Sequence, residues 1–256
     1  MLSIITVAKG RIETTKRAFN SIWDNADNPE DIEHLIMMDC NDKDLRQYIG
    51  EYIKSHPVGV VKAFTVCFCK SKTTYSQRKI HRDYWNPLAK NSSGDVIFGL
   101  CNDTIILTKG FDKIICDSVM MAKKELKHSY FQILVDDDSS LDLSPRVGDM
   151  CSWIILTKPA SDVIGGIVPD EITFSGGDSY VYNLFKNTTI RSQVDLITQI
   201  KTLHLSHYNG SANRDIVTES KPVHNADVDV KSADANNYFT KLDLSILKEY
   251  YANTKN

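Results

Sequence analysis

The chain has 256 residues, of which 42% are hydrophobic and 25% are charged, and its formal net charge is −3 at pH 7. This composition is typical of a globular protein with one large domain or two small ones. A slightly acidic chain has no general basic surface, so charge does not indicate nonspecific nucleic-acid binding. No apolar run reaches the roughly 20 residues of a membrane-spanning helix, and the opening "MLSIITVAKG" turns polar too early for a signal peptide. We therefore expect a cytoplasmic protein without a transmembrane segment.

The first half of the chain alternates strand and helix patterns. Residues 2–8 are a β-branched apolar run, typical of a buried parallel strand. Residues 12–26 follow with apolar side chains near helical spacing. This alternation predicts a doubly wound α/β sheet. The further elements expected here are strands at 34–39, 60–68 and 95–100 and helices at 44–55 and 81–94.

The second half is less regular, and no linker divides the chain. We expect strands at 130–138 and 150–158, a Gly-rich connection that leads into a helix from about Asp178, and a strand followed by a turn within 199–211. A polar excursion and a terminal helix at 238–254 complete the chain. The prediction is one domain, 1–256, with a nucleotide-binding half at 1–104, an acceptor half at 105–211 and a C-terminal extension at 212–256.

Six cysteines are scattered along the chain without the paired spacing of a zinc site. A zinc site is therefore disfavoured. We expect reduced thiols, as in most cytosolic proteins.

Polar side chains follow three of the predicted strands in the first half. They are Lys9–Arg11, Asp39–Asp42 and Cys101–Asp103, the last being a polar break in the apolar run "GLCNDTIIL". In open α/β sheets, ligands bind outside the carboxyl ends of the strands. These three groups are therefore the candidate site of a nucleotide-binding fold.

Five motifs follow one another, over about residues 2–211, in an order that resembles that of a known protein family. They are "SIITVAKGRIETTKRAFNSI", "MMDCND", "AKNSSGDVIFGLCND", "VIGGIVPDEITFSGGDSY" and "HLSHYNGS". Together they resemble the GT-A-fold glycosyltransferases, closest to the family 2 pattern. The chain departs from that pattern at Val7 and Gly10, which replace the Pro and Asn of the opening, at Cys101, which replaces the first acid of the D-x-D motif, and at Gly177, which replaces the first acid of an E-D pair.

The resemblance implies a GT-A (Rossmann-like) fold with a mixed, mostly parallel central sheet flanked by helices. It implies an inverting glycosyltransferase that moves a sugar from a nucleotide-diphosphate sugar, with a UDP sugar as the first expectation, to an acceptor hydroxyl. The acceptor stays open: a saccharide, another hydroxyl-bearing molecule or a modified nucleic-acid base.

The resemblance also implies a divalent cation, Mn²⁺ or Mg²⁺, which would offset the charge that develops on the departing diphosphate. Asp103 and His207 are its expected protein ligands, with His204 as the alternate to His207. The alternative for Asp103 is that it only caps a turn.

The nucleotide is expected over the first strands of the sheet. Asp39 would accept a hydrogen bond from a ring nitrogen of the base, Arg11 would contact phosphate or base, and Asn102 would contact ribose. The alternative for each is an ordinary solvated turn residue. The full expected nucleotide-binding set is Ala8, Lys9, Arg11, Asp39, Asn41 and Asn102.

Asp178 aligns with the second acid of the E-D pair and is the expected general base. Its alternative role, a helix N-cap, is compatible with that one. Trp153 is expected to contact the donor sugar or the acceptor, or else to be a core residue. Asp137 lies in the aspartate run "VDDDSSLD", in the region expected to shape the acceptor pocket, and a metal role for that run is the alternative.

Two rival functions stay open. A noncatalytic nucleotide-sugar-binding homologue is favoured by the departures at Cys101 and Gly177. A nucleotidyltransferase would need a Gly-rich basic loop after the first strand, and "VAKGRIETT" has a single Gly.

Overall fold

The structure is a computed structural model, and it describes residues 1–56, 59–66, 81–136, 153–170, 177–185 and 191–205. Statements about what is absent refer to these residues. Among them, no helix has the length and apolar character needed to cross a membrane. Asp137, His207 and the expected terminal helix at 238–254 lie outside the described residues.

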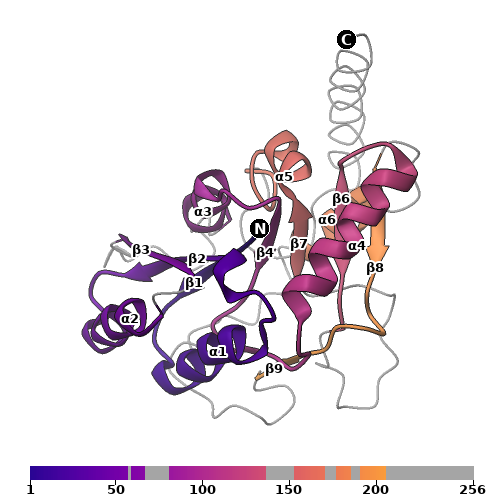
Figure 1. Cartoon of the computed structure of the whole chain (residues 1–256). Coiled ribbons are helices and arrows are strands. Elements are labelled where there is room, and N and C mark those ends of the chain that lie inside the picture. Colours follow the sequence, from indigo (N-terminus) through magenta and orange to yellow (C-terminus); the bar gives the residue numbers. More distant parts are fainter. Residues whose placement is uncertain (57–58, 67–80, 137–152, 171–176, 186–190, 206–256) are drawn as a thin grey trace, which may run out of the picture.

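A seven-stranded sheet with the order β3-β2-β1-β4-β7-β6-β8 forms the centre of the molecule (Figure 1). β1 is parallel to β2 and β4, β2 is parallel to β3, and β6 is parallel to β8, whereas β7 is antiparallel to both of its neighbours. The expected mixed, mostly parallel sheet is therefore confirmed. The strands are β1 (Leu2–Ala8), β2 (Ile32–Asp39), β3 (Val60–Val66), β4 (Val96–Gly99), β6 (Phe131–Leu134), β7 (Ile154–Thr157) and β8 (Ser192–Asp195).

Helices cover both faces of this sheet (Figure 1). Successive residues of β1 explain why two layers are needed: Leu2 and Ile4 pack into a cluster with side chains of α1 and α4, whereas Ile5 packs into a second cluster with α3, α5 and α6. Alternation along a strand directs neighbouring side chains to opposite faces. The helices are α1 (Ile12–Asn25), α2 (Lys43–Ser55), α3 (Asn86–Asn91), α4 (Phe111–Leu126), α5 (Lys158–Ile164) and α6 (Gly177–Phe185).

The elements expected in the first half are present, with shifted bounds. The expected helix at 81–94 is a π-helical turn, His81–Trp85, followed by α3, and Pro87 lies in the first turn of α3, where its missing N–H costs nothing. In the second half, α4, α5, β8 and the short strand β5 (Thr104–Ile106) were not expected from the sequence. Each of the last three is seven residues or shorter, too short for a clear period.

The expectation of reduced thiols is wrong for Cys40, which is disulfide-bonded, whereas Cys101 and Cys116 form no disulfide. Pairing depends on which cysteines the fold brings within about 6 Å between Cα atoms. Spacing along the chain does not reveal that distance.

A buried polar chain joins two helices and two strands on the α1–α2 face. His34 of β2 lies 3.1 Å from the Thr6 hydroxyl through Nε2 and 3.0 Å from the Tyr52 hydroxyl through Nδ1. Trp23 of α1 donates from Nε1 to the same Tyr52 oxygen, at 2.5 Å. Because His34 is fully buried, desolvation lowers its pKa to about 3.

This burial makes stability depend on pH. The unfolded chain takes up a proton on His34 near pH 6.5, whereas the folded chain does so only near pH 3. The free energy of unfolding should therefore be fully present above pH 6.5 and should fall as the pH drops towards 3, by at most about 1.4 kcal/mol per pH unit. Urea unfolding at pH 7, 6, 5 and 4 measures this slope. His34→Gln should reduce the pH dependence of the free energy of unfolding by about one proton. A variant whose unfolding free energy depends on pH as strongly as that of the wild type would contradict the prediction.

Candidate functional site

The candidate site lies where the strand order reverses. β1 has β2 on one side and β4 on the other, and the Leu100 amide, just past β4, donates to the Ile5 carbonyl at 3.0 Å. Such a switch point is the usual ligand site of an open α/β sheet, because the loops leaving the two strands diverge there. The loops that follow β1 and β4 are therefore neighbours.

The loop after β1 has an unusual backbone. Gly10 and Arg11 both have positive φ, 61° and 51°. The Gly10 amide donates to Asp42 Oδ2 at 2.7 Å, while Asp42 Oδ1 caps α2 by accepting from the Leu45 amide at 3.1 Å. A non-glycine residue in the left-handed region is uncommon and is often found at functional positions. The cap of α2 thus holds the loop in the conformation that presents Arg11.

Arg11 pairs with Asp103, which follows β4. Its Nη1 donates to Asp103 Oδ2 at 2.6 Å, and the side chains are only 15% and 9% exposed. Burial of both partners removes competing water, so this contact is stronger than a surface ion pair. Residues 92 positions apart in the chain are thereby joined at the switch point.

The other oxygen of Asp103 faces a histidine from a second, two-stranded sheet. β9 (Thr202–His204) pairs antiparallel with β5, with His204 opposite Thr104, and the Leu205 amide donates to the Asp103 carbonyl at 2.8 Å. This register places His204 Nε2 at 3.4 Å from Asp103 Oδ1. The alternate histidine of the sequence analysis is thus the one next to Asp103; the expected role of His207 stays untested.

Trp153 lies against this histidine from inside the core. The two ring centroids are 4.9 Å apart and nearly perpendicular, and the indole Nε1 donates to the Thr202 hydroxyl at 2.7 Å. The indole is therefore fixed from two sides and is 3% exposed. It packs against the same strand that carries His204, and its expected sugar contact stays a prediction.

Asp39 is the last residue of β2 and is 5% exposed. Its Oδ1 accepts from the Asn41 amide at 3.0 Å, and its Oδ2 lies 3.5 Å from Lys9 Nζ. Three of the expected nucleotide-binding residues are thus in one place. Asn102 instead donates to the Thr15 hydroxyl of α1 at 2.9 Å, and Ala8 is fully buried at the end of β1.

The expected metal site can be tested against the side chains present. Within the described ranges, no group of three or more His, Cys, Asp or Glu side chains is placed to hold a metal ion. Among the residues that the structure describes, the donors next to Arg11 are one carboxylate, Asp103, which already pairs with the Arg11 guanidinium, and one imidazole, His204. Hard divalent cations prefer several oxygen ligands. This donor set does not fit Mn²⁺ or Mg²⁺.

Asp178 lies in the first turn of α6, as expected. The residue before it, Gly177, is closely surrounded: a Cβ there would lie 3.0 Å from Val168 Cγ2 and 3.1 Å from His81 Cε1, so a larger side chain would require these neighbours to shift. Asp178 and Arg11 thus belong to different elements: Asp178 lies in α6, and Arg11 immediately precedes α1.

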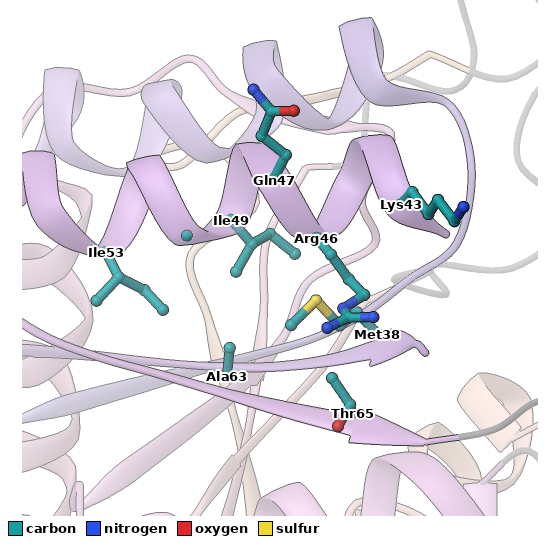
Figure 2. A pocket seen from close by; sticks show the side chains of 9 residues that line it. Met38, Lys43, Arg46, Gln47, Ile49, Ile53, Ala63 and Thr65 are labelled. Atoms are coloured by element: carbon teal, nitrogen blue, oxygen red, sulfur yellow. The ribbon is translucent and has the colours of Figure 1, made fainter. Parts of the chain in front are cut away.

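A separate cavity of about 680 Å³ lies between α2 and the strands β2 and β3 (Figure 2). Its lining mixes cationic and apolar side chains, and Arg46 donates from Nη1 to the Cys40 carbonyl. It lies towards β3, the edge strand of the described sheet, away from the β1–β4 switch point, and contains none of the expected site residues. Side chains labelled there include Met38, Lys43, Arg46, Ile49, Ile53 and Thr65.

A double-mutant cycle measures the strength of the Arg11–Asp103 contact. Arg11→Gln and Asp103→Asn should each lower the free energy of unfolding by about 1–3 kcal/mol, because each leaves a largely buried charge without its partner. The double variant should regain about 1 kcal/mol or more relative to additivity. The exposed pair Lys16–Glu13 on α1 is the matched control, with an expected coupling below about 0.5 kcal/mol. Equal coupling in the two pairs would contradict the prediction.

Comparison with protein-family models gives no match, and comparison with curated proteins gives none either. Solved structures do match. The chain superimposes on S. aureus TarS 1–349 in complex with UDP with a TM-score of 0.54 and 12% identity, covering 79% of this chain and 60% of that one.

Two further structures give similar values. PcManGT, a mannosyltransferase from Pyrobaculum calidifontis in complex with GDP-Man and Mn²⁺, has a TM-score of 0.56 and 10% identity, covering 79% of this chain and 56% of that one. GalNAc-T7 with UDP, GalNAc and Mn²⁺ has a TM-score of 0.52 and 15% identity, covering 80% and 43%. The chain thus spans less than two thirds of each of these proteins. At these identities the likeness concerns architecture, and it shows that the chain has the GT-A fold of glycosyltransferases.

Proposed function

We propose that the chain is a glycosyltransferase that takes a sugar from a nucleotide-diphosphate sugar, with a UDP sugar as the first candidate, and transfers it to an acceptor hydroxyl. The observation that carries the proposal is the cluster of Arg11, Asp103 and His204 at the switch point of a GT-A sheet. Similar structures hold UDP and GDP-Man, which supports a nucleotide-sugar donor.

The cationic side chains at the switch point suit a diphosphate. When the bond between sugar and diphosphate breaks, negative charge develops on the phosphate oxygens, and fixed positive charge lowers the barrier. Arg11 is held by its backbone and by Asp103, and Lys9 lies two residues away beside Asp39. The nearly buried carboxylate of Asp39, with Asn41 beside it, is the proposed acceptor for the base.

A metal ion is implied by the resemblance, and PcManGT and GalNAc-T7 are complexed with Mn²⁺. Such an ion acts as a Lewis acid on the departing diphosphate. The described donors, Asp103 and His204, do not form a set that suits Mn²⁺ or Mg²⁺. The steps proposed for this chain therefore depend on its own side chains.

Asp178 is the proposed general base. A carboxylate within hydrogen-bonding reach of the acceptor hydroxyl takes its proton as the oxygen attacks the anomeric carbon. A single displacement of this kind inverts the configuration of the sugar. Trp153 and Asp137 are proposed contacts of the sugar or the acceptor, which is a saccharide or another hydroxyl-bearing molecule such as a modified nucleic-acid base.

A thermal-shift series tests donor binding. The protein is melted with UDP, GDP and dTDP and with sugars linked to each of them. The ligands of one base should raise the melting temperature by about 5 °C or more at saturation, because a ligand that binds only the folded state stabilises it. ADP and CDP serve as controls. Silence across all uridine, guanosine and thymidine ligands would contradict the proposed function.

Asp178→Asn separates catalysis from binding. The variant should lose about 100-fold or more of its transfer or donor-hydrolysis rate, because the amide cannot accept the proton, while its affinity for the nucleotide stays unchanged. Asp162→Asn, at an exposed carboxylate of α5, is the matched control. Nuclear magnetic resonance of the product shows whether the anomeric configuration is inverted. A wild-type protein that binds nucleotide but turns over no donor would instead favour a noncatalytic homologue.

A further inference from the structure

At the position of the D-x-D motif, this chain has one acidic side chain instead of two, and a cationic side chain lies next to it. Cys101 stands where the first acid is expected, and the guanidinium of Arg11 lies on the acid that is left. Asp103 carries one negative charge and Arg11 one positive charge, so the pair itself has no net charge. A thiol does not restore the missing oxygen ligand, because sulfur suits softer metals than Mn²⁺ or Mg²⁺.

The ion pair also occupies one of the two carboxylate oxygens that Asp103 could offer a metal. Arg11 Nη1 lies 2.6 Å from Asp103 Oδ2. A hard divalent cation binds carboxylate oxygen at roughly 2.0–2.2 Å. Guanidinium and metal on one oxygen would be two cations a few ångströms apart in a site largely shielded from water, where their repulsion is strong. Occupation by one therefore disfavours the other.

Arg11 is kept near Asp103 by its backbone as well as by its charge. Its left-handed conformation follows that of Gly10, which is tied to the cap of α2 through Asp42. The Arg11 carbonyl also accepts hydrogen bonds from Thr14 Oγ1, at 2.8 Å, and from the Thr15 amide, at 2.9 Å, in the first turn of α1. The guanidinium thus starts from a Cα that three contacts hold in place.

We propose that Arg11 takes the place of the divalent cation at this site, so that the chain binds the diphosphate of its donor without a metal ion. The proposal rests on the proposed function, in that the switch point binds a nucleotide diphosphate. A guanidinium carries five N–H donors and binds phosphate oxygens in the same fork geometry as carboxylates. The ammonium of Lys9, beside Asp39, adds a second positive charge to the same loop.

The test compares nucleotide binding with and without metal. Isothermal titration of the wild-type protein with UDP and with GDP is carried out in EDTA and, separately, in MnCl₂. The affinity of the nucleotide that binds should agree within about threefold between the two conditions, well below the factor of ten that corresponds to a single strong interaction.

Two variants assign this binding to Arg11. In EDTA, Arg11→Gln should lower the affinity for the nucleotide by about tenfold or more, because a hydrogen bond from a charged donor is lost. Arg17→Gln, at an exposed arginine of the neighbouring helix α1, should leave the affinity unchanged. Melting temperatures of both variants establish that they are folded, and Arg11→Lys should retain part of the affinity because it keeps the charge.

The outcomes distinguish this inference from the function on which it rests. Binding that falls about tenfold or more in EDTA and returns with Mn²⁺ would overturn metal independence and leave a nucleotide-sugar enzyme in place. If the wild type binds the nucleotide equally well with and without metal, and Arg11→Gln binds it with the same affinity, the role of Arg11 would be overturned. Absence of UDP and GDP binding under both conditions would overturn the proposed function together with the inference.

Discussion

The ion pair between Arg11 and Asp103 is the contact on which the site depends. It joins the loop after β1 to the loop after β4 at the place where the strand order reverses, and both side chains are largely shielded from water. A charge in that position is stable only with a partner, because an unpaired buried charge is costly. The pair therefore constrains both the conformation of the loops and the charge that a ligand meets.

Contacts from neighbouring elements hold the two partners of this ion pair in position. Asp42 connects the first loop to α2, and the pairing of β5 with β9 carries His204 to the other side of Asp103. Further back, the buried chain through His34 links α1 and α2 to the sheet. Each of these contacts is made by residues from different elements, so the site is rigid to the extent that the helices and strands around it are packed.

Prediction from the sequence worked best where the signal was local. The buried run of β1 and the helical spacing in α1 predicted the first elements, and two of the polar groups predicted to follow the strands meet in the ion pair between Arg11 and Asp103. The choice of histidine was the part that local signals did not decide. His204 and His207 both fit the motif order, and the antiparallel register of β9 on β5 places His204 beside Asp103, whereas His207 lies outside the described residues.

The sequence by itself determined the α/β alternation, the residues that leave the carboxyl ends of the strands and the two departures at Cys101 and Gly177, because periodicity and residue type are properties of short stretches of chain. The tertiary structure decided that Arg11 meets Asp103 and that an imidazole lies over Gly177. These contacts join residues about 90 positions apart, and their geometry follows from strand order, register and side-chain packing, none of which is written in a local pattern.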